Sequence, residues 1–337
     1  MKKLLKTNEM LLFLLIVSIA LVFGMINPQI LTLANFYSLI RSSAIPAIFA
    51  LSIMLVMCCG GFDMSFAMIG AFSSYVVMFY HTSNGQFETS IFVIFAEAII
   101  IAVVLELFNW VLIDKLNLQP FITTLGTQSL LKGFLLAFIS TQYIYTLPNQ
   151  VAKLGTTYLD TATYEDGIDA QLHIVVIFVV VMYVIMHLIL QHTNFGRQIY
   201  AVGGDVDAAR RAGIDVSRVR FLVFVIAGII CGIGGVMHDA VARCSLPLPS
   251  DLVGKELNSI AAVVLGMGSQ KKARGSVLGT LLGVVLLQFI TGNLIMLGIP
   301  SYFQQAVSGL LIFAGLIVQM TGSGRKLVRK ERKTREA

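Results

Sequence analysis

Apolar runs of about 20 residues recur along the whole chain, and each is long enough to cross a lipid bilayer as a helix. Hydrophobic residues make up 57% of the 337 residues and charged residues only 12%, whereas a soluble domain carries roughly 25% charged residues. The chain therefore has too little polar surface to cover a water-soluble body. The sequence predicts an all-α fold, a polytopic bundle of membrane helices.

The runs predict about ten transmembrane segments, some of them broken helices. They lie at residues 10–26, 43–59, 62–80, 90–112, 120–140, 172–191, 221–241, 255–268, 276–297 and 301–320. The run at 255–268 is too short for a full crossing, so we expect a half-helix or a bent helix there. With a cytoplasmic N-terminus, this count places the C-terminus in the cytoplasm too. It also places inside all of the 24 Lys and Arg residues except Arg41, Lys132, Lys153, Arg243 and Lys255, as the positive-inside rule requires.

Residues 192–220 form the longest clearly polar interruption and contain five arginines. Asp205 is a candidate N-cap of a short helix that ends at Gly213, and Gly203 and Gly204 supply the bend that leads into it. A short helix between two membrane spans is well shaped to contact another protein at the membrane face. The alternative is a positively charged loop that only fixes the topology.

This interruption resembles the cytoplasmic loop of permease subunits from bacterial ABC importers of the ribose, xylose, arabinose and galactose type. The family also includes autoinducer importers, and further similarity to it covers residues 60–305. In that family the loop carries the coupling helix that docks on the ATPase subunit. The resemblance implies that the ATPase-coupling residues are Gly196, Arg197, Tyr200, Gly203, Asp205, Ala209, Arg210 and Gly213.

Asp63 lies in the sequence Gly-Gly-Phe-Asp-Met-Ser, residues 60–65, which resembles the family pattern Gly-Gly-Ile-Asp-Leu-Ser. The two glycines predict a broken backbone at membrane depth, where freed polar groups must line a cavity or find partners. Two roles remain open for Asp63. It either caps the N-terminus of the third span or takes a direct part in transport.

Three further blocks are similar to the family: Asn109 with residues 120–127, residues 256–266, and residues 301–305. The chain departs from the family at Trp110, where a glycine is usual, and at its basic turn 270–275. The hydroxyls of the fifth span either line a pore or bond back to their own helix. The resemblance and the polar residues of the spans together assign the substrate pathway to Asp63, Asn109, Thr124, Gln128, Glu256 and Gln304.

Ionisable residues within spans are costly, so Glu97, Glu106 and Lys132 need partners. Glu106 and Lys132 lie on neighbouring spans, and we expect an ion pair between them. The sharper alternative is a proton relay through these residues, which an ion-coupled secondary transporter would use. Glycine patterns of the small-xxx-small type, at 228–232 and 275–283, predict close helix contacts within the subunit or at a dimer seam.

Enzymatic motifs are absent from the sequence. It contains no P-loop, no His-Glu-x-x-His, no Gly-x-Ser-x-Gly and no zinc-ligand spacing of its four cysteines. We therefore expect no catalytic residue, no metal site and no cofactor in this chain. By the resemblance, ATP and Mg²⁺ would be bound by a partner ATPase.

The chain is expected to form a single permease domain, residues 1–324, followed by a basic cytoplasmic tail, residues 325–337. Residues 141–171 are predicted to be an acidic outer loop that is either solvated or contacts an external partner. The basic residues lie at span ends and on the tail, which fits topology signals and anionic lipid better than a nucleic-acid-binding face.

The resemblance implies an importer of a monosaccharide or similar polyhydroxylated solute in the inner membrane. Its partners would be the ATP-binding cassette ATPase, an extracytoplasmic solute-binding protein, and a second permease in a homodimer or heterodimer.

Overall fold

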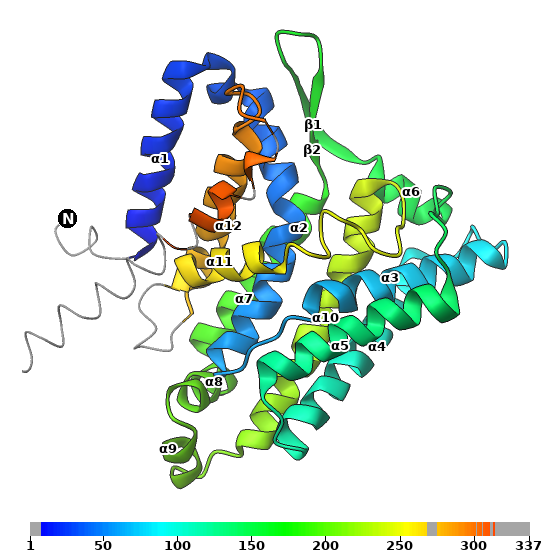
Figure 1. Cartoon of the computed structure of the whole chain (residues 1–337), viewed down its shortest axis with the longest axis vertical. Coiled ribbons are helices and arrows are strands. Elements are labelled where there is room, and N and C mark those ends of the chain that lie inside the picture. Colours follow the sequence, from blue (N-terminus) through cyan, green and yellow to red (C-terminus); the bar gives the residue numbers. More distant parts are fainter. Residues whose placement is uncertain (1–7, 268–274, 301, 305, 311–312, 314–337) are drawn as a thin grey trace, which may run out of the picture.

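The structure is a computed structural model that describes residues 8–267, 275–300, 302–304, 306–310 and 313. Most of the described chain is helical (Figure 1). The α-helices are α1 Asn8–Ile26, α2 Leu33–Cys58, α3 Phe66–Ser83, α4 Ile91–Trp110, α5 Pro120–Phe134, α6 Asn149–Gly155, α7 Val175–His192, α8 Asn194–Gly204, α9 Val206–Arg211, α10 Val216–Ala242, α11 Glu256–Met267 and α12 Val277–Asn293. A 3-10 helix covers Pro28–Leu31, and π-helical turns extend α4 over Val111–Lys115 and α5 over Leu135–Ile139.

Six helices in the described part of the chain are long and apolar enough to cross a membrane. They are α1, α2, α4 with its π-helical turn, α5 with its π-helical turn, α7 and α10. α11 and α12 are shorter apolar helices, and α11 agrees with the short run expected at 255–268. The predicted span at 301–320 lies mostly outside the described residues. The chain is therefore a multi-pass membrane protein by length and composition, while the count of ten remains a prediction.

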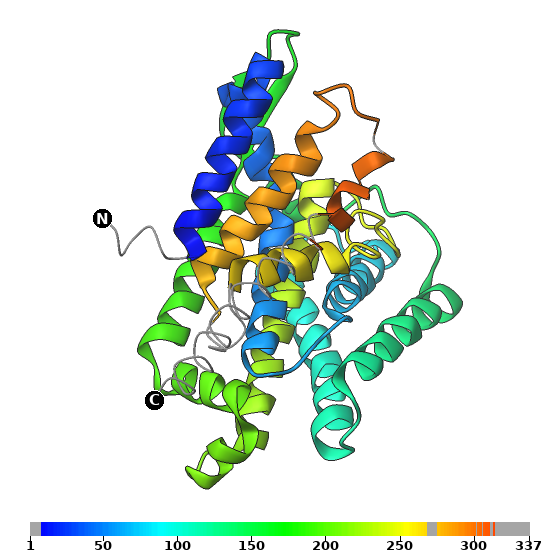
Figure 2. The same cartoon turned by 60° about the vertical axis from the view of Figure 1, so that its left-hand side comes forward.

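The centre of the bundle is α10, which packs against α2, α3 and α4. Glycines permit these contacts, because a Cβ on Gly228 would lie 2.6 Å from the Cα of Val103, and one on Gly232 would lie 2.7 Å from the Cα of Ile99. Gly279 and Gly283 make equally close contacts with α11. These glycine pairs of the small-xxx-small patterns therefore pack helices within the subunit. α1 lies along α12 at the edge of the bundle (Figure 2).

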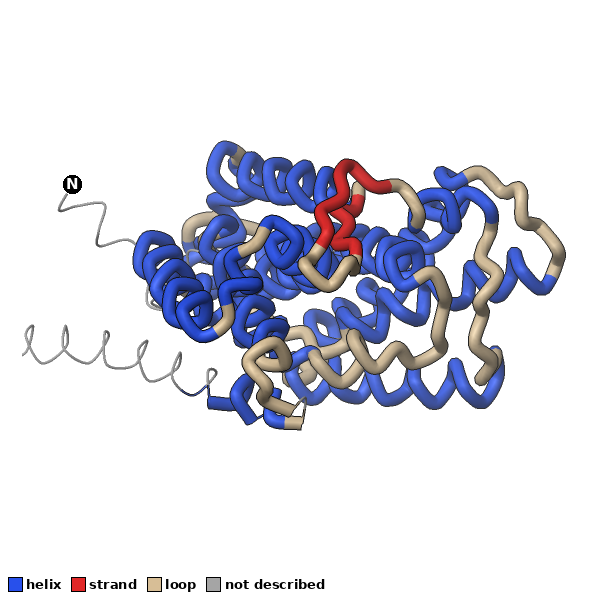
Figure 3. The backbone as a smooth tube through the Cα atoms, turned by 90° about the horizontal axis from the view of Figure 1, so that it is seen from above, coloured by secondary structure: helices blue, strands red, loops and turns tan. Residues whose placement is uncertain are grey.

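A two-stranded antiparallel sheet corrects the expectation of an all-α chain with a loop at 141–171. Strand β1 covers Tyr158–Thr163 and strand β2 covers Asp169–His173, with Ala162 paired to Ala170. The hairpin projects beyond the helices at the end of the molecule opposite to α9 (Figure 1). Seen from above, its two strands lie over the helices (Figure 3). Tyr158, Thr161 and Thr163 of β1 are residue types that favour strands, and Gly167, at φ +80°, permits the turn.

α2 runs through the bundle from the hairpin end to the α8 end and is mostly buried. Pro46 lies inside this helix. Because proline has no backbone N–H, the bond that residue 46 would donate to the carbonyl of Ser42 is absent. This break in the helix ladder falls beside a cavity that Ser42 and Pro46 both line.

Candidate functional site

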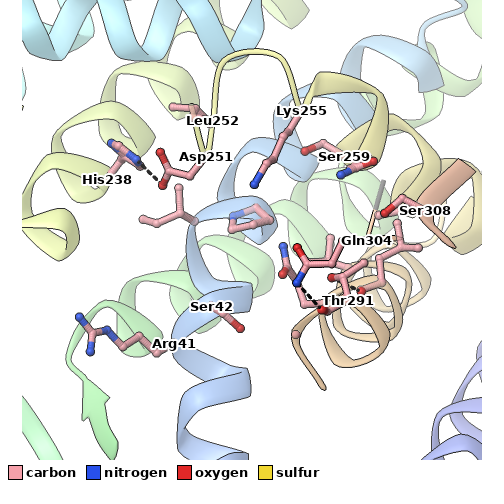
Figure 4. A pocket seen from close by; sticks show the side chains of 18 of the residues that line it. Arg41, Ser42, His238, Asp251, Leu252, Lys255, Ser259, Thr291, Gln304 and Ser308 are labelled. Carbon is pink, nitrogen blue, oxygen red and sulfur yellow. Dashed lines mark hydrogen bonds and ion pairs between the residues drawn. The ribbon is translucent and has the colours of Figure 1, made fainter. Parts of the chain in front are cut away.

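A cavity of about 560 Å³ opens between α2, α10, α11, α12 and the residues Gln304 and Ser308 (Figure 4). Its walls combine aliphatic side chains with hydroxyl, amide and charged groups. The polar lining residues are Ser38, Arg41, Ser42, His238, Asp251, Lys255, Asn258, Ser259, Gln288, Thr291, Gln304 and Ser308. Such a set offers hydrogen-bond donors and acceptors on several sides, which suits a solute with many hydroxyl groups.

His238 connects the cavity wall to a buried carboxylate. Its Nε2 lies 3.0 Å from Oδ2 of Asp251, and its Nδ1 lies 3.4 Å from Oδ1 of Asp239. Asp239 is almost fully buried, and its Oδ2 accepts a 2.7 Å hydrogen bond from the hydroxyl of Ser245. The histidine therefore fixes the segment between α10 and α11, to which Asp251 belongs, against the end of α10. On the same segment Lys255 points toward the cavity (Figure 4).

The hydrogen bond from His238, above all, holds the pKa of the Asp251 carboxyl below its ordinary value. A carboxyl with a lowered folded pKa stabilises the folded arrangement above its unfolded pKa, and this contribution is lost as the pH falls through the folded pKa. We therefore expect Asp251→Asn to speed hydrogen exchange of residues 246–255 at neutral pH. The difference from wild type should disappear in acid, after correction for intrinsic exchange. Ser250→Ala is the control, and equal exchange in the Asp251 variant at neutral pH would contradict the prediction.

A second polar cluster lies inside the bundle and does not border the cavity. Asn109 is its centre: Nδ2 donates to Oγ of Ser65 at 2.8 Å, and Oδ1 accepts from Oγ1 of Thr127 at 2.7 Å. Nδ2 also lies 3.5 Å from Oε2 of Glu106. Because α4 carries Asn109 and Glu106 while α5 carries Thr127, the cluster joins two helices to the segment before α3.

Asp63 does not cap α3 as one of the two expectations proposed. The N-cap is Ser65, and Oδ1 of Asp63 accepts from the N–H and the hydroxyl of Ser65 at 2.7 and 2.6 Å. Oδ2 of Asp63 is buried without a hydrogen-bond partner among the described residues. Asp63 therefore shapes the turn ahead of the helix and adds a buried carboxyl group to the cluster.

The expected ion pair between Glu106 and Lys132 is wrong. Glu106 is fully buried and faces Asn109 and, at 3.8 Å, the thiol of Cys231. No ion pair joins it to Lys132, which is half-buried on α5. Glu97 instead pairs with His81 at 2.7 Å, between α3 and α4.

The hydroxyls of α5 do bond back to their own helix. Thr123, Thr124, Thr127 and Ser129 each donate to the carbonyl four residues earlier. Thr124 also accepts a 3.0 Å hydrogen bond from the N–H of Met64, across to the segment before α3. The structure thus gives two of these hydroxyls, those of Thr124 and Thr127, a second role in joining elements.

The predicted pathway residues fall into three places. Gln304 lines the cavity, while Asp63, Asn109 and Thr124 belong to the buried cluster. Gln128 of α5 donates to the buried carboxylate of Glu256, at the start of α11, next to Lys255 of the cavity. Sequence reasoning missed the cavity side chains on α2 and α10. In the sequence they are marked only as polar residues in the part of each helix that borders the cavity.

The short helix expected after Asp205 is confirmed as α9. Asp205 caps it by accepting from the N–H of Ala208 at 2.9 Å, and Gly213, at φ +81°, ends the turn that follows. The expected glycine bend is wrong, because Gly203 and Gly204 form the last turn of α8 and the extended residue is Asp205.

The predicted coupling residues divide into inward-facing and exposed ones. Gly196 and Ala209 are buried, the hydroxyl of Tyr200 donates to the carbonyl of Gly275 at 3.0 Å, and Gly203 packs on Cys58. Arg197 and Arg210 are exposed. Apart from Asn194 at the start of α8, the exposed residues of α8 and α9 form what we term the α8–α9 face: Arg197, Gln198, Gly204, Asp207, Ala208, Arg210 and Arg211.

Comparison with known proteins matched residues 35–316 to the family described as branched-chain amino acid transport system / permease component. The chain is 30% identical over 318 residues to the ribose import permease protein RbsC of Haemophilus influenzae, covering 93% of each chain. It is 31% identical to RbsC of Bacillus subtilis, covering 91% of this chain and 90% of the relative. The chain is 28% identical to the L-arabinose ABC transporter permease protein AraH of Azospirillum brasilense, and the match covers 90% of this chain and 85% of the relative. No solved structure matches the chain. On the family match and on these relatives, the chain belongs to the branched-chain amino acid transport system / permease component family.

Proposed function

We propose that this chain is the permease subunit of an ATP-binding-cassette importer that moves a monosaccharide or similar polyhydroxylated solute across the bacterial inner membrane. The observation that carries the proposal is full-length similarity to permeases named for ribose, arabinose and galactose import. The family relationship makes the chain a transport subunit and not an enzyme. It also favours this function over ion-coupled secondary transport.

The cavity supports the proposed substrate class. Hydroxyls, amides and a histidine–carboxylate pair surround it, and a neutral sugar needs donors and acceptors more than a fixed counter-charge. In an alternating-access mechanism, the cavity would take the solute from one side, and movement of the helices around it would open it to the other.

The energy would come from a separate ATPase that binds ATP and Mg²⁺. The α8–α9 face is exposed at the end of the molecule opposite to the β1–β2 hairpin (Figure 1). If the hairpin faces outward, the α8–α9 face is cytoplasmic, where the ATPase works. The hairpin end would then receive the extracytoplasmic solute-binding protein, and a second permease, identical or a sibling, would complete the pore.

ATPase docking is the decisive test. We expect a candidate ATPase from the same cell to co-purify with the wild-type chain in detergent and with Lys153→Glu, an exposed charge reversal at the hairpin end. Arg210→Glu should weaken docking by about tenfold or more, equivalent to about 1.4 kcal/mol, because it reverses an exposed charge on the α8–α9 face. If no ATPase binds the wild-type chain, the proposed function fails.

A further inference from the structure

We infer that residues 59–65, the segment between α2 and α3, are a strut that transmits movement of α8 to α4 and α5, with Gly203 as its contact on α8. The inference rests on the proposed function, because ATP-driven movement of α8 is what the strut would transmit. Gly203 is then a positioning residue, which acts on α4 and α5 through the strut.

The first end of the strut touches α8 backbone to backbone. A Cβ on Gly203 would lie 2.0 Å from the carbonyl oxygen of Cys58, the last residue of α2, and 3.2 Å from the backbone nitrogen of Gly60 in the strut. Gly60 has φ +78°, so it also favours glycine. A contact between two backbones has no flexible side chain to absorb a displacement, so movement of Gly203 is passed directly to the strut.

The second end of the strut is tied to α4 and α5. The N–H of Met64 donates to Thr124 on α5, and the hydroxyl of Ser65 accepts from Asn109 on α4. Phe62 packs against Phe121 of α5, with ring centroids 5.6 Å apart. Asp63, Met64 and Ser65 are buried, so this end cannot swing into solvent.

The contacts continue from α5 to the cavity. Four residues beyond Thr124, Gln128 donates to Glu256 at the start of α11. Glu256 also accepts from the N–H of Gly254 at 2.9 Å, and Lys255 between them lines the cavity. A contiguous set of hydrogen bonds and packed groups therefore joins α8, through the strut and α5, to the cavity wall. Contiguity alone does not establish coupling, which requires a measured displacement.

The matched pair of variants is Gly203→Ala and Gly204→Ala. Both residues lie in the last turn of α8, but a Cβ on Gly204 would meet nothing within 4 Å. The experiment uses the complex of the full chain with its ATPase, and every variant also carries Cys244→Ala. The measured quantities are distances between spin labels, with and without MgATP and vanadate. Labels at Thr161→Cys and Asn194→Cys report α8, and labels at Thr161→Cys and Ser129→Cys report α5; all three positions are exposed.

In the wild type and in Gly204→Ala, we expect nucleotide to shift both distances. In Gly203→Ala, the α8 shift should remain while the α5 shift falls by about twofold or more. An unchanged α5 shift in that variant, or no α8 shift in the wild-type complex, would overturn the inference.

Thr124→Val cuts the other end of the strut without touching α8 and provides the same test if Gly203→Ala does not fold. It removes the acceptor for the N–H of Met64, so it too should reduce only the α5 shift. A wild-type chain that binds no ATPase would instead refute the proposed function, so the two failures are distinguishable.

Discussion

Gly235→Ala is expected to prevent α10 from seating on α3. A Cβ at this position would lie 2.1 Å from the carbonyl oxygen of Gly70, far inside van der Waals contact, and neither group belongs to a side chain that can turn away. Overpacking typically costs about 1–3 kcal/mol, and contact with backbone belongs at the upper end of that range. The apparent melting temperature in detergent, followed by size-exclusion chromatography, should fall by several degrees or the folded peak should vanish.

Gly133→Ala is the control for this substitution. Gly133 also lies within a helix, α5, but a Cβ there would meet nothing within 4 Å. Alanine favours a helix over glycine by about 1 kcal/mol, so this variant should melt at the same temperature or higher. Equal melting of the two variants would show that α10 does not pack on α3 as closely as the structure places it.

Asn109→Leu is expected to destabilise the chain by about 2 kcal/mol. The substitution removes the bonds of Asn109 to Ser65 and to Thr127, which join α4 to other elements, and hydrogen bonds between membrane helices contribute about 0.6 kcal/mol each on average. Leucine also leaves the buried hydroxyl of Thr127 with only its own helix carbonyl. The measurement is again the melting temperature in detergent.

Ser129→Ala removes a hydroxyl that bonds only to the carbonyl of Leu125, on the exposed side of α5. It should leave the melting temperature unchanged within error. If Asn109→Leu behaves like Ser129→Ala, the cluster around Asn109 does not hold α4, α5 and the segment before α3 together.

Sequence reasoning predicted well what depends on neighbouring residues. Apolar run length identified the long helices, and the Asp205 cap with Gly213 identified α9, because caps and stops are set within a few residues. The hairpin at 158–173 escaped prediction, since its polar strands carry a weak apolar pattern and are stabilised by pairing with each other.

Contacts between distant residues could not be predicted. The family motif drew attention to Gly203, but no spacing rule shows that this glycine faces Cys58, about 145 positions earlier, instead of a partner protein. Likewise, Glu106 and Lys132 occupy neighbouring helices, yet which face each presents depends on how those helices rotate about their axes. The cavity joins residues from 38 to 308, so it exists only once the whole bundle has assembled.

Pro46 alters the main chain of α2 beside the cavity. Ser42 and Pro46 both line it, and the carbonyl of Ser42 lacks the helix bond that residue 46 would otherwise donate. This main-chain carbonyl therefore keeps an acceptor that a regular helix would use within itself. Because it belongs to the main chain, this break in the helix ladder survives every substitution of Ser42 and depends on Pro46 alone.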